Sequence, residues 1–186
     1  LNQKADIVRD FIRSRPRQAK DIIATYYSDD DEAKNDLLYE WSLWKRPEQD
    51  LVIPSDVSAL LLLCGRGWGK THWLSNDIVD YCLSKPNLRV GLMAADYGNL
   101  KKVNFMGDSG IINSINPNVK YDFNKSDLTV EFENGSQIVS YSAEAFDKTR
   151  GQQFHRMYLD ELAAWQYDEE ALDACRMLLR LGENPI

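Results

Sequence analysis

The segment from Leu60 to Thr71 constrains the fold more than any other part of the chain. It reads LLLLCGRGWGKT, an apolar run that passes into a glycine-rich turn and then into Lys70 and Thr71. We predict a buried strand over 59–64 and a helix over 71–83, which is the layout of a phosphate-binding loop (Walker A). In such a loop the backbone N–H groups and the helix dipole bind phosphate oxygens.

The loop side chains have distinct expected roles. Lys70 would reach the β- and γ-phosphates, and the Thr71 hydroxyl would bind Mg²⁺. Cys64 stands where the usual pattern has its first glycine, and we expect Gly65 and Gly67 to supply the missing backbone freedom. The residues expected to bind the nucleotide are Cys64, Gly65, Arg66, Gly67, Trp68, Gly69, Lys70 and Thr71.

Arg66 is the second departure from the usual loop, because it places a cation where the γ-phosphate would lie. The alternative interpretation of the whole segment is a glycine-rich β-turn before a surface helix. A readable strand before the turn and a readable helix after it favour the phosphate loop.

Size and composition describe one α/β core with a small appendage. The chain has 186 residues, of which 44% are hydrophobic and 27% are charged, as in ordinary globular domains. No apolar run approaches the ~20 residues that span a bilayer, and no secretory signal is visible, so we expect no membrane partner. The 3 scattered cysteines favour neither a disulfide framework nor a zinc site, and they fit a reducing cytoplasm.

The formal net charge of −7 argues against a domain whose whole surface binds nucleic acid. Contact with DNA through a local basic patch stays open, because phosphate binding depends on where the cations lie. We interpret the densest basic cluster as a solvated helix face or turn. It consists of Arg13, Arg15, Arg17 and Lys20.

Hydrophobic spacing divides the chain into two predicted domains. Over residues 1–46, apolar residues recur at helical spacing, as at Ile7, Val8, Phe11 and Ile12. The acidic run 28–32 would cap a third helix. We expect this part to be a helical appendage, or lid, that ends before Pro47. Residues 47–186 would form the core.

Predicted strands and helices alternate in the core, which implies a mainly parallel sheet flanked by helices. The pair Asn134-Gly135 is a strong tight-turn signal, so we expect a β-hairpin insertion to interrupt the alternation. The predicted elements after the loop are strands at 88–94 and 157–159, helices at 97–105 and 168–181, and hairpin strands at 128–132 and 137–141.

Asp160 and Glu161 follow the short apolar run 157–159 and supply the carboxylates that a phosphate loop needs. Asp160 would bind Mg²⁺, and Glu161 would orient the water that attacks the γ-phosphate. An Asp-Glu pair alone is more typical of a helix start or a solvated turn. Ligands bind beyond the carboxyl ends of the strands in open α/β sheets, so the pair and the loop can meet at one edge.

Gln49 lies between the helical appendage and the first predicted core strand. A side-chain amide can both donate to and accept from an adenine edge. The residues alone leave two interpretations open, a base-reading glutamine and a solvated linker glutamine.

Several short sequence blocks appear in a diagnostic order. They are WKRPEQ (44–49), LLLCGRGWGKT (61–71), GDSG (107–110), YSAE (141–144), RGQQF (150–154), LDELAAW (159–165) and LRLGENP (179–185). Over roughly residues 38–186 the chain resembles the N-terminal ATPase domain of the large terminase subunit, the DNA-packaging motor of tailed bacteriophages and prophages. Two arginines make this likeness more specific than one based on a phosphate loop and an Asp-Glu pair alone. Arg66 precedes Lys70 in the loop, and Arg150 precedes Asp160-Glu161.

The resemblance implies a P-loop NTPase core of the ASCE/RecA-like type that uses ATP and Mg²⁺. For Arg150 it suggests an arginine finger, which can reach the ATP of a neighbouring subunit; a solvated surface arginine is the alternative. The other roles that it implies are adenine contact by Gln49, phosphate and Mg²⁺ binding by Lys70 and Thr71, Mg²⁺ binding by Asp160, catalysis by Glu161 and sensing of the γ-phosphate in cis by Arg66.

The resemblance also implies the partners and the setting. We expect double-stranded DNA, a portal protein on a procapsid, a small terminase subunit and a homo-oligomeric ring, all in the cytoplasm of a bacterial host. Large terminases also carry a coupling motif and an RNase H-like nuclease domain, and we expect both to lie outside this chain. The resemblance thus predicts a DNA-packaging ATPase. The alternatives are an ATP-binding assembly switch without sustained turnover and a helicase-like P-loop ATPase.

Overall fold

A computed structural model describes residues 10–54, 56–183 and 185–186 of the chain. It divides into two compact units, one made of Leu1–Val52 with Ile115–Asn118 and the other of Ile53–Ser114 with Val119–Ile186. Among the described residues, no helix is long and apolar enough to cross a membrane.

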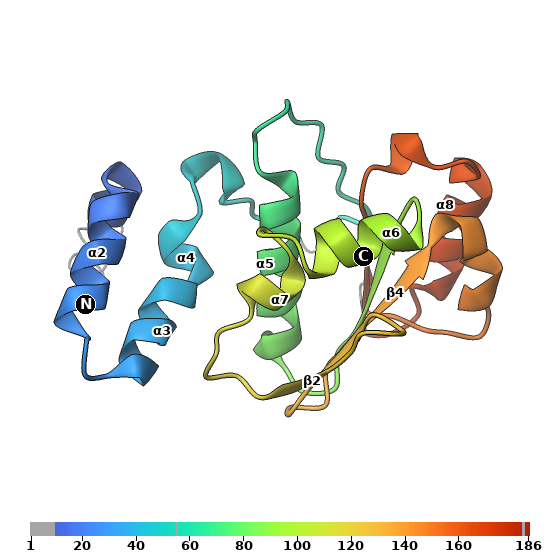
Figure 1. The fold of residues 1–186 in the computed structure, drawn as a ribbon. Coiled ribbons are helices and arrows are strands. Elements are labelled where there is room, and N and C mark those ends of the chain that lie inside the picture. Colours follow the sequence, from blue (N-terminus) through green and yellow to red (C-terminus); the bar gives the residue numbers. More distant parts are fainter. Residues whose placement is uncertain (1–9, 55, 184) are drawn as a thin grey trace. The chain divides into compact units, whose positions relative to one another are not determined.

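The first unit is helical, as predicted (Figure 1). The side chain of Asp30 caps one of its helices by accepting a hydrogen bond from the Ala33 N–H at 3.0 Å, so the acidic run does begin a helix. The predicted third helix is broken at Glu40, whose extended backbone separates two shorter helices. Ile7 and Val8 lie outside the described residues. The elements are α2 (Pro16–Tyr26), α3 (Asp31–Tyr39), α4 (Trp41–Trp44) and η1 (Pro47–Gln49).

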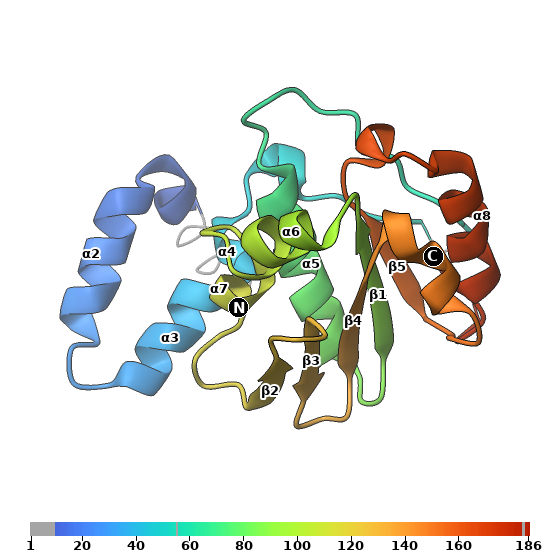
Figure 2. The ribbon, with the colours of Figure 1, turned by 45° about the vertical axis from the view of Figure 1, so that its right-hand side comes forward.

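The second unit is built on a five-stranded sheet with the order β2-β3-β4-β1-β5 (Figure 2). Its strands are β1 (Arg89–Ala94), β2 (Tyr121–Asn124), β3 (Thr129–Phe132), β4 (Gln137–Ser142) and β5 (Arg156–Leu159). β1 pairs in parallel with both β4 and β5, whereas the β2–β3 and β3–β4 pairs are antiparallel. The prediction of a mainly parallel sheet was therefore wrong: the sheet is mixed.

The sheet is mixed because the predicted hairpin is part of the sheet. β3 and β4 form that hairpin, and β4 then continues as the parallel neighbour of β1. Gly135 turns the chain with φ of 80°, which favours glycine, so the turn signal was correct. β2, which the sequence did not predict, extends the antiparallel part.

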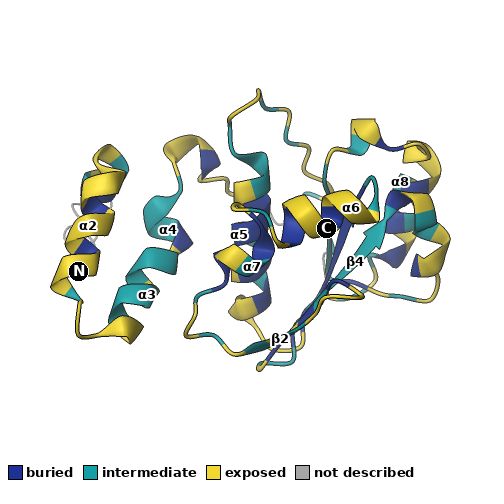
Figure 3. Cartoon of the chain, viewed as in Figure 1, coloured by how far each residue is buried: buried dark blue, intermediate teal, exposed yellow. Residues whose placement is uncertain are grey.

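Helices cover both faces of the sheet (Figure 1). On one face of the sheet, Met93 of β1 packs against buried residues of α8 and of the neighbouring turns. Successive side chains of a strand point to opposite faces, so Leu92 lies on the face of α5. Much of the buried surface belongs to α5 and the strands (Figure 3). The remaining elements are α5 (Lys70–Ser84), α6 (Tyr97–Asn99), η2 (Leu100–Phe105), α7 (Ile111–Ser114), η3 (Ala143–Thr149), η4 (Leu162–Ala164) and α8 (Asp168–Leu178).

The predicted strand at 59–64 does not form. This segment has no regular structure, and the side chains of Leu61 and Leu63 are 71% and 86% exposed. A buried strand needs a free edge to pair its backbone groups. β1 already has a neighbouring strand on each side. On the outer side of β5, the Met157 N–H donates to the Ile186 carbonyl at 2.8 Å, and the His155 carbonyl accepts from the Ile186 N–H at 3.1 Å. Ile186 therefore occupies part of the outer edge of β5, which is the edge strand next to β1.

Candidate nucleotide and metal site

The glycine-rich loop takes its shape from two left-handed residues. Gly67 and Gly69 both have φ of 83°, and Gly69 is the N-cap of α5. Gly65 has no positive φ, so the expectation for Gly65 was wrong, and the pair that supplies the backbone freedom is Gly67 with Gly69. A side chain at either position would strain the backbone that leads into α5.

Lys70 lies across this loop. Its Nζ donates a hydrogen bond to the Cys64 carbonyl at 3.1 Å, which closes the loop from its first residue to its last. The first helical bond of α5 runs from the Trp73 N–H to the Gly69 carbonyl at 2.9 Å. The first N–H groups of a helix point outward along its axis, so those of Lys70 and Thr71 are the ones that an anion at this end would meet.

A polar cluster of four residues joins α5 to β5. The Tyr158 hydroxyl donates a hydrogen bond to Asp77 Oδ2 at 2.6 Å, and Arg156 lies 3.6 Å from the same oxygen. The Arg156 guanidinium also stacks 3.9 Å from the centre of the Tyr81 ring. Burial and the neighbouring Asp77 carboxylate raise the pKa of Tyr158 well above its ordinary value, so this hydroxyl remains a donor.

The direction of α5 and this cluster together decide which ends of α5 and β5 meet. A short turn joins α5 to β1, which runs parallel to β5, so α5 runs antiparallel to β5. Asp77 lies seven residues, or about two turns, after Lys70 on α5. Tyr158 lies two residues before Asp160, and alternate side chains of a strand share a face. The loop at the start of α5 and the carboxylate after β5 therefore lie at the same edge of the sheet, on the α5 face.

Asp160 is held by three hydrogen bonds. Its N–H donates to the Met93 carbonyl at 2.9 Å, and its own carbonyl accepts from Trp165 Nε1 at 3.0 Å. Its side-chain Oδ2 accepts from Asn104 Nδ2 at 2.7 Å. Neither Asn104 nor the Tyr158–Asp77 pair was found from the sequence; the one available signal was that Tyr158 and Asp160 alternate along one strand.

Glu161 has an unusual backbone. Its φ of 51° and ψ of 47° are left-handed, although it is not a glycine, and it is exposed at the start of η4. Such a conformation typically costs about 1–3 kcal/mol and tends to occur at functional sites. The left-handed backbone shows that the extended conformation of β5 has ended by Glu161.

The donor chemistry at this edge fits Mg²⁺. Among the described residues, no group of three or more His, Cys, Asp and Glu side chains could hold a metal ion. A Mg²⁺ ion that accompanies a nucleotide needs fewer protein ligands, because it keeps several waters and also binds phosphate oxygens. Thr71 would supply a hydroxyl and Asp160 a carboxylate, and both are the hard oxygen ligands that Mg²⁺ prefers.

Gln49, Arg66 and Arg150 are the other residues that were predicted to contribute to the site. Gln49 belongs to the first unit, where it is buried and its Oε1 accepts a hydrogen bond from the Arg46 N–H at 3.1 Å. Arg66 lies exposed in the loop. Arg150 forms an ion pair with Asp147 at 2.6 Å, and its side chain is 84% exposed.

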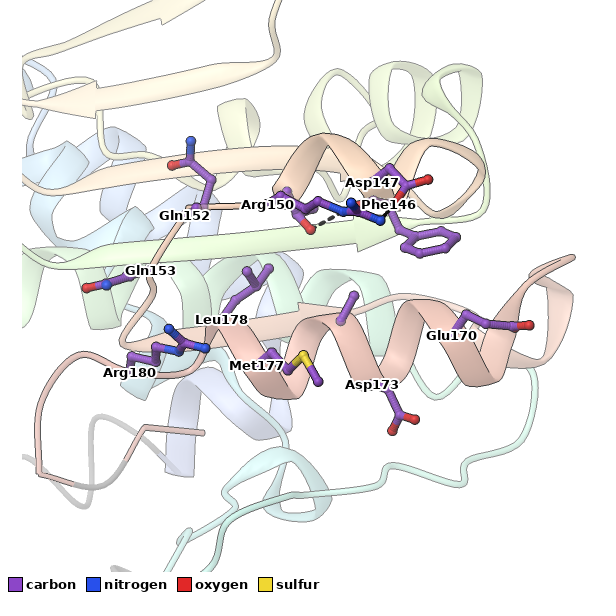
Figure 4. A pocket seen from close by; sticks show the side chains of 13 residues that line it. Phe146, Asp147, Arg150, Gln152, Gln153, Glu170, Asp173, Met177, Leu178 and Arg180 are labelled. Carbon is purple, nitrogen blue, oxygen red and sulfur yellow. Dashed lines mark hydrogen bonds and ion pairs between the residues drawn. The ribbon is translucent and has the colours of Figure 1, made fainter.

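Arg150 lines a groove of about 390 Å³ between η3 and α8 (Figure 4). Phe146, Met177 and Leu178 form the apolar part of its lining, and charged side chains such as Arg180 surround them. The figure shows the side chains of Arg150 and Asp147 close together at the C-terminal end of η3. This arginine thus lies on an outer face of the second unit.

A comparison with protein families agrees with this geometry. The family model described as "Terminase large subunit, T4likevirus-type, N-terminal" matches residues 61–186, which include the loop, the sheet and Asp160-Glu161. No curated protein sequence matches the chain.

Proposed function

This chain belongs to the family of T4-type terminase large subunits, as part of their N-terminal region, and on that premise we propose that it is an ATPase motor domain. Membership of the family associates the chain with viral DNA packaging. In the proposed activity, ATP hydrolysis drives double-stranded DNA into a procapsid. The observation that carries the proposal is the Tyr158–Asp77 hydrogen bond, because it aligns the loop of α5 with the carboxylates that follow β5.

The proposed roles follow from the positions at this edge. Lys70, released from the Cys64 carbonyl, binds the phosphates together with the N–H groups of α5, and Arg66 adds a second cation. Thr71 and Asp160 hold Mg²⁺, which when bound neutralises charge on the phosphate oxygens. Glu161 orients the attacking water, and its strained backbone supports this role.

Two further roles involve residues outside the loop sequence. Arg150 acts as an arginine finger toward the ATP of a neighbouring subunit in a ring. Its exposure supports this proposal, because an exposed ion pair such as Arg150–Asp147 contributes little to stability and is readily exchanged. Gln49 contacts the adenine. The wider partners are double-stranded DNA, a portal protein on a procapsid and a small terminase subunit, in the cytoplasm of the bacterial host.

The test is ATP binding and turnover by the wild-type protein, Lys70→Ala and Glu161→Gln. Lys70→Ala removes the phosphate-binding cation and weakens ATP binding, whereas Glu161→Gln keeps binding and lowers turnover by about 10²–10⁴-fold. The matched controls are Lys85→Ala, at the opposite end of α5, and Glu169→Gln, in the first turn of α8. Unchanged turnover in both site variants would refute the proposal.

The two alternatives correspond to other outcomes of the same measurement. Tight ATP binding without turnover in the wild-type protein would indicate an assembly switch. Turnover that responds to single-stranded DNA and ignores double-stranded DNA would indicate a helicase-like ATPase. Because one fold serves all three functions, only such measurements separate them.

A further inference from the structure

Asn104 is a fully buried polar side chain beside the predicted metal ligand. It is 0% exposed and lies on η2, one turn of helix that follows β1. Its Nδ2 donates to Asp160 Oδ2 at 2.7 Å, across 56 residues of sequence. Its own carbonyl oxygen, Oδ1, is also buried and has no hydrogen-bond partner among the described residues.

The orientation of the Asn104 amide follows from the charge of its partner. An ionised carboxylate can only accept hydrogen bonds, so the NH₂ group of Asn104 must face Asp160. The Oδ1 atom then needs a donor from elsewhere, because a buried acceptor without one is unfavourable. A water molecule or a ligand with an O–H or N–H group would satisfy it.

The backbone of η2 holds Asn104 firmly in this position. η2 is a π-helical turn, in which the Met106 N–H donates to the Lys101 carbonyl at 3.0 Å, and such wide turns are frequent at functional sites. The neighbouring Phe105 is fully buried and stacks on Phe123 with 5.6 Å between ring centres. The apolar neighbours thus anchor the turn, and Asn104 is its buried polar member.

We infer that Asn104 is a positioning residue for Asp160 and an outer partner of a hydrated divalent cation. Its NH₂ group orients the carboxylate, and its free Oδ1 accepts a hydrogen bond from a water that such a cation carries. Mg²⁺ retains several waters when it binds through few protein ligands, and partners of this kind tune metal affinity. The inference rests on the proposed function, because it assigns Asp160 to the cation.

The test measures binding of a fluorescent ATP analogue at increasing Mg²⁺ and, separately, in excess chelator. Asn104→Leu keeps the side-chain volume and removes both polar groups. We expect the Mg²⁺ concentration at half-saturation to rise by about 10–100-fold, with unchanged nucleotide affinity in chelator. Asn104→Ser, which is small and polar, should shift the Mg²⁺ requirement in the same direction and serves if Asn104→Leu does not fold.

The control is Asn134→Ala. It removes an asparagine that donates to the backbone carbonyls of Cys82 and Lys85 instead of to Asp160. This variant should lower the melting temperature and keep the wild-type Mg²⁺ requirement. A wild-type Mg²⁺ requirement in the Asn104 variants would overturn the inference. If the wild-type protein itself shows no nucleotide binding that depends on Mg²⁺, the proposed function fails instead.

Discussion

The Tyr158 hydroxyl lies 2.6 Å from Asp77 Oδ2, so a single hydrogen bond joins the strand that ends at Asp160 to the helix that begins at Lys70. The two residues are 81 positions apart in sequence. Arg156 is the third member of this contact. Burial by itself lowers the pKa of its guanidinium, but the hydrogen bond to Tyr158 and the charge of Asp77 outweigh burial, and the pKa is raised above its ordinary value. Arg156 therefore stays charged beside Asp77.

Removing the Tyr158 hydroxyl should destabilise the protein. Tyr158→Phe leaves the ring in place and removes a hydrogen bond to a charged acceptor, which is worth about 1.5–3 kcal/mol. Urea unfolding measures the loss. Tyr26→Phe is the matched control, because Tyr26 is 84% exposed. Equal unfolding free energies for the two variants would contradict the structural role of the Tyr158–Asp77 bond.

Relieving the strain at Glu161 should separate stability from activity. Glu161→Gly accepts the φ of 51° without cost and should raise the free energy of unfolding by about 1 kcal/mol while abolishing turnover. Glu161→Gln keeps the strained backbone, so it should lose turnover without the gain in stability. If both variants have the stability of the wild-type protein, the left-handed backbone at Glu161 stores no strain.

The trans role proposed for Arg150 predicts complementation between two inactive variants. Arg150→Ala protein retains Glu161, and Glu161→Gln protein retains Arg150, so mixed rings contain some complete sites. ATP turnover of the mixture should exceed that of either variant alone. Asp147→Ala, which removes the ion-pair partner at 2.6 Å, is the control and should remain active. No recovery at concentrations that form rings would argue for a role in cis or for none.

A methyl group at Gly91 should fit only if the end of the Met157 side chain moves away. An added Cβ there would overlap Met157 and lie 3.4 Å from the Phe154 ring, both part of the packing beside β5. We expect Gly91→Ala to lower the free energy of unfolding by about 1 kcal/mol, the low end of the usual cost of overpacking, because the flexible end of Met157 can rearrange. Gly65→Ala is the control, because nothing lies within 4 Å of its added Cβ. Thermal or urea unfolding of the two variants checks the difference.

Alkaline pH should weaken the fold through its buried thiols. Burial raises the pKa of Cys82 and of Cys175 to about 12, from an ordinary value of 9.0. The unfolded chain loses these protons first, so their contribution is complete below about pH 9 and is lost as the pH rises toward 12. Over this range each thiol lowers the free energy of unfolding by up to about 1.4 kcal/mol per pH unit.

Urea unfolding at about pH 8, 9 and 10 under reducing conditions measures this slope. The double variant Cys82→Ala, Cys175→Ala should lose stability less steeply than the wild-type protein. Its tyrosines, among them Tyr141 with a pKa raised by burial, are unchanged and cancel in the comparison. Parallel slopes would contradict the assignment to the thiols.

Local patterns predicted most of the regular elements. The helix of α5, the strands β1 and β5 and the hairpin with Gly135 lie where periodicity and turn residues indicated, because each depends mainly on neighbours in sequence. The strand at 59–64 failed for the opposite reason. Its apolar residues favour burial, but pairing also needs a free sheet edge, and Ile186 occupies part of the outer edge of β5.

In the candidate site, too, some residues could be predicted from the sequence and others only from the tertiary structure. The sequence by itself determined the glycine-rich loop, Lys70 and the Asp160-Glu161 pair, because these are contiguous motifs whose chemistry is local. Only the tertiary structure decided that Asn104 holds Asp160 and that Tyr158 holds Asp77, since each pair joins residues more than 50 positions apart. The physical reason is that a buried polar group is satisfied by whichever element packs against it, and packing partners are chosen by the whole sheet.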